Sequence, residues 1–375
     1  MDFSFTREQE AIRKFIRDFC KKEIAPIADQ IEKENKIPDD LKTKLSKFKI
    51  FGIPFEKEYG GSGAGFIGAT IALEEISKVS GAVSMFVGCN YLTGIPIHLH
   101  GTEEQKKLYL SQLCEGKLIG SFAFTEAATG SDPTSITTEA RLEGNEYIIN
   151  GSKRFITGAD YDGPIVFFAK DAEGVSGFIG QKNIKGYSIP RPWEKMGTRG
   201  MSLVDIYFDN YRVPASNLLG LKGKGYLVLL DTIAIGKLDS ATIMMGLAEG
   251  ALEEAIKYAN ERTVRGKPIS GMQSIQTMIS DMVIKLEAAK WLAYRVAWMI
   301  DQKDPAVKVQ SAIAKSFITE VAADVARIAI RVHGAYGYVK DFKIERLFRD
   351  IALGEIVEGT SELQKVIVAH SVIGK

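Results

Sequence analysis

A carboxylate near the C-terminus is the residue in this chain best suited to proton-transfer chemistry. Glu358 follows two apolar residues and precedes Gly359. Apolar surroundings would raise the pKa of its carboxyl group, which suits a general base for a weakly acidic C–H proton. Taken alone, the pattern is equally typical of a loop that enters a terminal helix, with Ser361 and Gln364 as a capping box.

Two further stretches carry small, hydroxyl-bearing or aromatic residues where predicted strands end. In the first, Phe124 is followed by Thr125 and then by Ser131, within a run rich in small residues. Backbone N–H groups and short side chains in such a run can approach a planar polar ligand. In the second, Phe155 and Thr157 place an aromatic ring and a hydroxyl where a flat cofactor could lie. Each stretch is also typical of an ordinary turn or a strand core.

Composition and motifs exclude several classes of protein. Lys and Arg number 48 and Asp and Glu number 47, so the net charge of +1 gives no nucleic-acid footprint. The chain has no Gly-x-Gly-x-x-Gly after a strand, no Gly-x-Ser-x-Gly and no His-Glu-x-x-His motif. His98 and His100 have no further ligand nearby, so we predict no metal site. Catalysis would therefore depend on scattered residues or on a cofactor.

The cellular location is expected to be cytoplasmic. The first residues lack the basic-then-apolar pattern of a signal peptide, and no long uncharged apolar run predicts a membrane span. The three cysteines, Cys20, Cys89 and Cys114, are widely spaced and odd in number, which favours reduced thiols.

The elements that would position these residues fall into three segments. Residues 1–120 show the apolar spacing of amphipathic and buried helices. Residues 121–220 contain short β-type runs separated by turn signals, which predicts an antiparallel β domain. Residues 221–375 return to long helical patterns rich in Ala, Ile and Met, which suggests a helical bundle. The predicted fold class is therefore α+β, with the β domain in the middle.

Several motifs now give a resemblance to a known family. Residues 125–132 are similar to the Thr-Glu-Pro-x-x-Gly-Ser-Asp motif of the acyl-CoA dehydrogenases, with Ala127 in place of proline. Residues 155–158 match the family's Trp-Ile-Thr-Asn motif, with Phe155 in place of the tryptophan. Residues 357–360 match its Tyr-Glu-Gly-Thr motif. The chain resembles this family over essentially its whole length, which implies an acyl-CoA dehydrogenase-like fold ending in a four-helix-bundle domain.

The resemblance implies an FAD-dependent enzyme of fatty acid metabolism. Glu358 would remove the pro-R α proton of an acyl thioester while flavin N5 takes the β hydride, giving the trans-2-enoyl thioester. The resemblance places ten residues at FAD, namely Phe124, Thr125, Ser131, Phe155, Thr157, Arg262, Gln273, Arg331, Thr360 and Glu362. It places three residues at the substrate, namely Ser131, Lys237 and Gly359.

The resemblance also implies partners. Arg262 and Gln273 match positions that reach the flavin diphosphate of a neighbouring subunit, which implies a homotetramer built as a dimer of dimers. The expected electron acceptor is an electron-transferring flavoprotein. The expected substrate is an acyl-CoA with a short, branched or otherwise non-dicarboxylic acyl group, because residues 82–87 are apolar where a glutaryl-CoA dehydrogenase would bind a distal carboxylate.

Some positions depart from the family pattern and leave more than one function open. Arg265, Arg331 and Ala335 stand where the family usually has Phe, Gln and Gly. Ala234 and Lys237 stand where it has the Asp and Arg of an Asp-x-x-Arg element. The acyl group could therefore be a thioester of coenzyme A, bound through altered contacts, or a thioester of the phosphopantetheine of a carrier protein. The chain could also be an enoyl-thioester reductase working in reverse, an oxygen-using relative or a non-catalytic scaffold.

Overall fold

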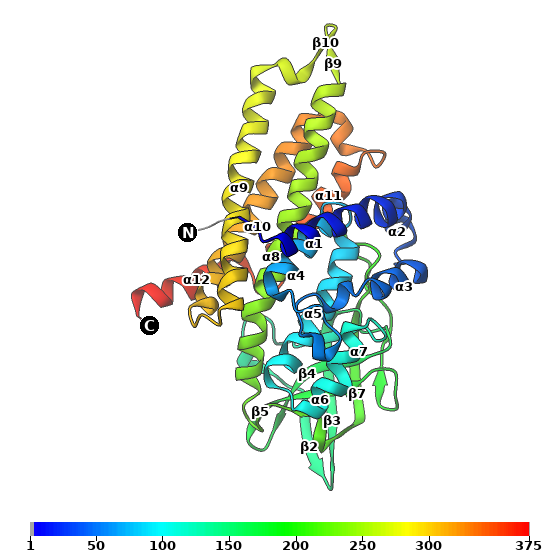
Figure 1. Cartoon of the computed structure of the whole chain (residues 1–375). Coiled ribbons are helices and arrows are strands. Elements are labelled where there is room, and N and C mark those ends of the chain that lie inside the picture. The colour runs from blue at the N-terminus through cyan, green and yellow to red at the C-terminus, as the bar shows by residue number, and fades with distance from the viewer. Residues whose placement is uncertain (1–3, 375) are drawn as a thin grey trace.

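The chain folds as a helical segment, a β-sheet and a second helical segment in the computed structural model, which describes residues 4–374 (Figure 1). This arrangement confirms the α+β class and the α–β–α order predicted from the sequence. The sheet lies at one end of an elongated molecule, and the long C-terminal helices extend away from it (Figure 1). The N-terminal helices lie against the side of these long helices.

The N-terminal segment is built around two buried helices, α4 and α5, which both pack against the long helix α8. By length and composition α5 could span a membrane, but 78% of its apolar stretch is buried inside the protein, so it is a core helix here. The helices are α1 (Arg7–Phe19), α2 (Ala28–Glu34), α3 (Asp39–Lys47), α4 (Gly65–Ser77), α5 (Gly81–His100), α6 (Glu103–Gln105) and α7 (Ser111–Cys114).

The middle segment is one twisted sheet with the strand order β6-β7-β3-β2-β4-β5-β8. Most pairs are antiparallel, as predicted, but β4 pairs in parallel with both β1 and β2, so the predicted antiparallel pairing is wrong at these two contacts. β1 comes directly from the N-terminal helices and enters the sheet in the direction of β4. The strands are β1 (Ser121–Ala123), β2 (Glu139–Glu143), β3 (Glu146–Thr157), β4 (Pro164–Asp171), β5 (Gly174–Gln181), β6 (Tyr187–Ser188), β7 (Leu203–Pro214) and β8 (Leu218–Leu219).

The C-terminal segment is organised by α8, which packs against α4, α5, α9, α10 and α11. Its 37 residues make it about 55 Å long at 1.5 Å per residue. Most of its first half is buried, which explains why no amphipathic pattern marks where it begins. The elements are α8 (Gly225–Glu261), β9 (Thr263–Val264), β10 (Lys267–Pro268), α9 (Gln273–Asp301), α10 (Val307–His333), α11 (Lys343–Ile351) and α12 (Ser361–Ile373).

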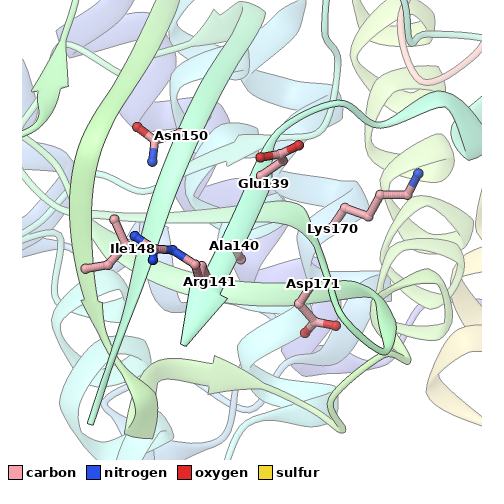
Figure 2. Close-up of a pocket in the computed structure, with 7 residues that line it drawn as sticks. All are labelled: Glu139, Ala140, Arg141, Ile148, Asn150, Lys170 and Asp171. Atoms are coloured by element: carbon pink, nitrogen blue, oxygen red, sulfur yellow. The ribbon is translucent and has the colours of Figure 1, made fainter. Parts of the chain in front are cut away.

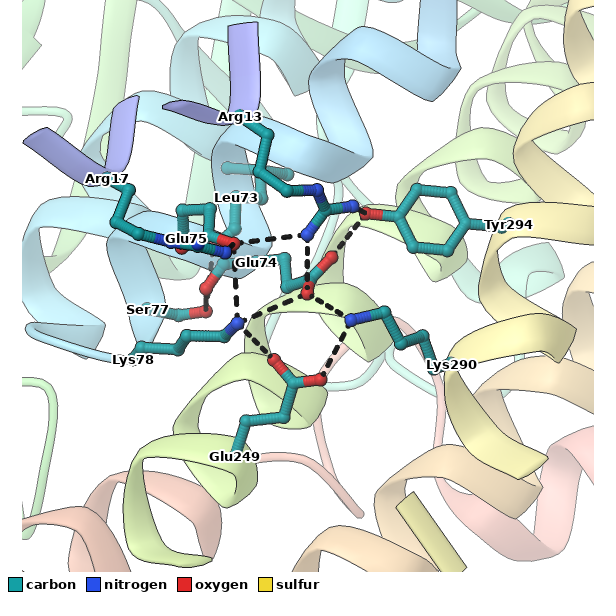
Figure 3. A network of polar contacts seen from close by, with 10 residues as sticks. All are labelled: Arg13, Arg17, Leu73, Glu74, Glu75, Ser77, Lys78, Glu249, Lys290 and Tyr294. Carbon is teal, nitrogen blue, oxygen red and sulfur yellow. Dashed lines mark hydrogen bonds and ion pairs between the residues drawn. The ribbon is translucent and has the colours of Figure 1, made fainter. Parts of the chain in front are cut away.

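A cluster of buried charges joins the N-terminal helices to the C-terminal ones (Figure 3). Its centre is Glu74 on α4, whose side chain is fully buried. A Glu74 oxygen lies 3.0 Å from a guanidinium nitrogen of Arg13 and 2.9 Å from Nζ of Lys290. Burial alone would raise the pKa of Glu74, but Lys78, Lys290 and Arg13 together hold it below its usual range. The cluster therefore ties α1, α4 and α9 together through one ionised carboxylate.

Replacing Glu74 by Gln tests this link. The variant leaves three cations around a neutral side chain in the interior, so we expect the free energy of unfolding to fall by about 3 kcal/mol. Asp18→Asn is the control, because the Asp18–Lys14 pair has side chains that are 63% and 81% exposed. We expect that control to change stability little. Equal losses in the two variants, measured by denaturant unfolding, would contradict a central role for Glu74.

Candidate functional site

Glu358 lies in the turn between α11 and α12, in a backbone conformation that L-residues rarely adopt. Its φ is 55°, and Gly359 after it has a φ of 86°. Such a pair of left-handed residues persists only where neighbouring groups hold it. Here Nζ of Lys315 on α10 donates a hydrogen bond of 2.7 Å to the carbonyl of Gly359. The side-chain amide of Gln364 donates to the carbonyls of Glu358 and Gly359 at 3.2 and 3.1 Å.

These contacts correct one prediction about the helix that follows. The N-cap of α12 is Thr360, whose hydroxyl accepts a hydrogen bond of 3.3 Å from the backbone N–H of Leu363. The predicted capping box of Ser361 with Gln364 is therefore wrong. Ser361 already lies inside the helix, and Gln364 reaches back to support the turn that carries Glu358.

The surroundings of Glu358 favour proton transfer near neutral pH. Its carboxylate has no hydrogen-bond partner among residues 4–374. Burial raises the pKa of Glu358 to about 7, although the nearby charges of Lys237 and Lys315 lower it in part. Burial also lowers the pKa of Lys237, and it lowers the pKa of Lys315 to about 8. A carboxyl group with this pKa can both take up and release a proton at physiological pH.

Helix α8 comes close to the Glu358 carboxylate at a glycine. A Cβ atom on Gly236 would lie 3.2 Å from an oxygen of Glu358 and 2.7 Å from a methyl group of Leu92 on α5. Any side chain at position 236 would therefore compete with the carboxylate for space. Helix α8 therefore packs directly against Leu92 and the Glu358 carboxylate at this position, which requires a residue without a side chain.

Cys89 on α5 connects Glu358 to the sheet. Its thiol donates hydrogen bonds to the carbonyls of Gly120, at 3.3 Å, and Thr157, at 3.5 Å. Burial raises the pKa of the Cys89 thiol to about 12, and the charge of Glu358 adds to the shift. Thr157 at the end of β3 thus contacts Cys89 through its carbonyl, and the charge of Glu358 acts on the same thiol. The structure brings together residues that are 201 positions apart in the sequence.

Phe155, two residues before Thr157 on β3, forms an aromatic pair with Trp193. A register shift between β3 and β7 puts Phe155 in a bulge with a φ of 58°. One oxygen of Asp205 accepts hydrogen bonds from the backbone N–H of Phe155, at 3.1 Å, and from the indole N–H of Trp193, at 2.9 Å. The two rings lie 5.7 Å apart, and Phe155 is 52% exposed. The carboxylate thus holds two partly exposed rings in place.

A second buried carboxylate fixes the loop that follows β1. Glu126 accepts hydrogen bonds from both Thr137 and Thr138 and pairs with Nζ of Lys153 at 2.6 Å. Its neighbour Thr125 and the exposed Ser131 have side-chain hydroxyls without a protein partner in the described part of the chain. The loop is therefore rigid at Glu126 and leaves these hydroxyls free for another molecule.

The residues around this loop fit FAD. A flavin needs a flat apolar surface and several hydrogen-bonding groups at its edge. The exposed ring of Phe155 and the free hydroxyl of Thr125 supply both kinds of contact. Phe124 has a more structural position, because its ring packs edge-on against Phe168 with centroids 6.4 Å apart. Thr360 and Glu362 lie in the first turn of α12, next to Glu358.

The remaining predicted FAD residues lie elsewhere in the chain. Arg262 and Gln273 flank the β9–β10 hairpin, which is at the opposite end of the molecule from the sheet (Figure 1). Arg331 lies near the end of α10 at the same end, where the Arg262 guanidinium is 5.6 Å from the ring of Tyr336. All three side chains are exposed. Within a single chain they do not join the site around Glu358.

Sequence reasoning missed several residues that build the site. Cys89 and Lys315 lie in long helices and act through single contacts, so no local pattern could have marked them. Asp205 did leave a signal, because it is a lone acid between two buried apolar residues of β7. A separate hollow on the sheet contains none of the predicted residues (Figure 2). It is lined by Glu139, Ala140, Arg141, Ile148, Asn150, Lys170 and Asp171.

Comparisons with known proteins agree with this architecture. Three family models match consecutive parts of the chain: "Acyl-CoA dehydrogenase, N-terminal domain" at residues 6–117, the middle domain at 121–211 and the C-terminal domain at 223–373. The chain is 40% identical to 3-(aryl)acrylate reductase of Clostridium sporogenes, covering 98% of this chain and 99% of that protein. It is 39% identical to the caffeyl-CoA reductase-Etf complex subunit CarC of Acetobacterium woodii, covering 99% and 100%.

A solved structure extends the likeness to three dimensions. The butyryl-CoA dehydrogenase of Megasphaera elsdenii superimposes with a TM-score of 0.96 at 32% identity, and the match covers 100% of both chains. The arrangement of the sheet and both helical segments is therefore shared along the whole length.

Glu358→Gln tests the burial of this carboxyl group. Its pKa is raised from 4.5 to about 7 in the folded protein, so ionisation favours the unfolded state as pH rises between these values. The wild type should lose up to roughly 3 kcal/mol across this window, whereas the Gln variant should not. We therefore expect the variant's advantage in melting temperature to be absent below pH 4.5, to grow towards pH 7 and to stay constant above it.

The control for this comparison is Glu355→Gln, which replaces an exposed carboxylate in the same turn. It should show no advantage that grows with pH. A Glu358→Gln variant that melts in parallel with the wild type at every pH would contradict the burial of the Glu358 carboxyl group.

Proposed function

The chain belongs to the acyl-CoA dehydrogenase family, a family of FAD-dependent oxidoreductases, and we propose that Glu358 transfers the α proton of its acyl-CoA substrate. The observation that carries this proposal is the Glu358 carboxylate itself. It has a pKa of about 7, no protein hydrogen-bond partner among residues 4–374 and a position that shares Cys89 with Thr157. A residue serving only to cap a helix would need none of these properties.

The side chains around Glu358 suit the two stages of α-proton removal. The ionised carboxylate takes the α proton, which is weakly acidic because the neighbouring thioester carbonyl can delocalise the resulting charge. Lys237, the buried cation whose charge acts on Glu358, stabilises negative charge that builds on the acyl group. Gly236 lets helix α8 approach the carboxylate directly, because it has no side chain. FAD, when bound against Phe155 and Thr157, supplies the two-electron redox chemistry.

Enoyl-CoA reduction is the second candidate direction of the same chemistry. The similar proteins from Clostridium sporogenes and Acetobacterium woodii are both named as reductases. In that direction a protonated Glu358 would deliver a proton to the α carbon. Since its pKa lies at about 7, both protonation states are populated near neutral pH. The same residues therefore serve either direction of the reaction. The pH dependence of the rate distinguishes dehydrogenation from reduction.

We also propose an electron-transferring flavoprotein as the redox partner and a homotetramer as the assembly. The name of the Acetobacterium protein places it in a complex with such a flavoprotein. Arg262, Gln273 and Arg331 support the tetramer, because they are exposed at one end of the chain and would complete a cofactor site only in a second copy. The mass of the holoenzyme in solution tests this assembly.

The carrier of the acyl group is proposed to be coenzyme A. The full-length likeness to proteins named for CoA thioesters supports it. The alternative is the phosphopantetheine of a carrier protein, which the Ala234 and Lys237 departures leave open. Lys237 is buried, and its charge lowers the pKa of Glu358. This effect on the base accounts for the lysine without a role in binding the carrier.

Anaerobic flavin bleaching tests the role of Glu358. The purified protein should be yellow or take up FAD, and a panel of short, branched and aryl acyl-CoAs should bleach it. Glu358→Gln should slow bleaching by each reactive acyl-CoA at least about 10³-fold, because the base is lost while the cofactor remains. Stopped-flow absorbance of the FAD-loaded protein provides the rates.

Glu355→Gln is the matched control and should bleach at the wild-type rate, since its carboxylate is exposed. Bleaching of Glu358→Gln at the wild-type rate would remove this residue from its proposed role. A protein that neither contains nor binds FAD would contradict a redox function. Bleaching only by an acyl group on a carrier protein would reassign the carrier.

The pH profile provides a separate test through Lys237→Met. Dehydrogenation needs ionised Glu358, so kcat/KM should rise with pH through about 7 and then level off. Removing the Lys237 charge should move this rise to higher pH by about one unit. For enoyl reduction the rate should instead fall through the same pKa. Lys308→Met, a change at an exposed lysine of α10, is the control and should leave the profile in place.

A further inference from the structure

Asp239 on α8 is a buried acid that nothing in the proposed reaction uses. Its side chain is 5% exposed, and its Oδ2 atom has no hydrogen-bond partner among residues 4–374. Burial raises the pKa of Asp239 well above its usual value, and the charge of Glu358 raises it further. A buried carboxyl group without a hydrogen bond lowers the stability of the fold. We therefore expect its partner to be another molecule.

Asp239 lies on the side of α8 that approaches Glu358. It follows Gly236 by three residues, so the two positions share one face of α8. That face meets α5 at Leu92, and Gly236 also meets the Glu358 carboxylate. The charge of Glu358 acts on Asp239, and the charge of Asp239 acts on Tyr91, so Asp239 lies on the side of α8 towards α5. An acyl chain whose α carbon lies at Glu358 would extend along this face.

Three nearby polar side chains, those of Tyr91, Lys237 and Ser240, are engaged elsewhere, whereas the buried hydroxyl of Thr242, three residues along α8, also has no partner among residues 4–374. The hydroxyl of Tyr91 donates a hydrogen bond of 2.6 Å to the carbonyl of Ile50. Lys237 is only two residues from Asp239, so it leaves the helix in another direction, and its charge acts on Glu358. The hydroxyl of Ser240 donates a hydrogen bond of 3.0 Å to the carbonyl of Lys237. Within the described part of the chain, no group donates a hydrogen bond to Oδ2 of Asp239.

We propose that Asp239 is a specificity-determining residue that accepts a hydrogen bond from a hydroxyl or ammonium group on the acyl chain of the substrate. The inference rests on the proposed function, because Glu358 defines where the α carbon lies. A site built to bind a polar group discriminates strongly against the analogue that lacks it, since the protein group is then left unpaired. The enzyme should therefore prefer acyl groups that carry a donor beyond the reacting bond.

Two matched substrate pairs test this preference on the FAD-loaded holoenzyme. The hydroxyl pair is 3-(4-hydroxyphenyl)propanoyl-CoA against 3-phenylpropanoyl-CoA. The ammonium pair is 6-aminohexanoyl-CoA against heptanoyl-CoA, which has the same number of chain atoms. We expect kcat/KM for flavin bleaching to be at least about tenfold higher for the donor-bearing member of one pair. Preference for the apolar member in both pairs would overturn the inference.

Variants assign the preference to Asp239. Asp239→Leu should fold, because it replaces an unpartnered buried carboxyl with an apolar group, and it should reduce the preference at least about tenfold. Asp239→Asn keeps an acceptor oxygen, so it should preserve a preference for hydroxyl and lose one for ammonium. Ser240→Ala is the control and should keep the wild-type ratio. An unchanged ratio in Asp239→Leu would overturn the inference.

The outcomes also separate this inference from the proposed function. Bleaching by the apolar acyl-CoAs alone, with loss of that activity in Glu358→Gln, would support the function and overturn the role of Asp239. Absence of bleaching by all four acyl-CoAs would contradict both.

Discussion

The arrangement of this protein depends on one partly buried carboxylate, that of Glu358, which has no hydrogen-bond partner among residues 4–374. Burial raises its pKa to about 7, and only the partial compensation by Lys237 and Lys315 keeps the charged form accessible. Burial also lowers the pKa of both lysines, while the charge of Glu358 raises it in part. The left-handed turn that carries Glu358 is held through its carbonyls, which leaves the carboxylate free for a substrate.

Each of the three segments of the chain contributes residues to the surroundings of Glu358. The C-terminal helices carry Glu358 and the glycine that makes room for it, the N-terminal helix α5 supplies Cys89, and the sheet supplies Thr157. Such a junction can be stable only if the segments cannot slide past one another. The buried charge cluster around Glu74 meets this need, because its carboxylate is shared by groups from three helices. The two carboxylates therefore differ in one respect. Glu74 has its partners inside the chain, whereas the Glu358 carboxylate has no hydrogen-bond partner among residues 4–374.

The sequence predicted the layout and singled out Glu358, but it did not predict the contacts that support the turn around Glu358. Turn signals and apolar periodicity are local, so they marked the β segment and the helices correctly. Parallel pairing of β1 with β4 is a long-range event that no local pattern records. The capping box at Ser361 was misassigned by one residue, because Thr360 and Ser361 are equivalent by residue type and only the backbone distinguishes them. Asp239 has the sequence surroundings of an ordinary helix residue, and only the fold shows its burial without a partner.

The central claim is that Glu358 exchanges a proton with the α carbon of an acyl-CoA. The most direct measurement is the uptake of deuterium at that carbon from heavy water, followed by proton NMR under anaerobic conditions with the FAD-loaded protein. The wild type should exchange the α proton of a reactive acyl-CoA, and Glu358→Gln should fail to exchange it while still binding FAD. Equal exchange by the two proteins would show that another group moves the proton and would contradict the account.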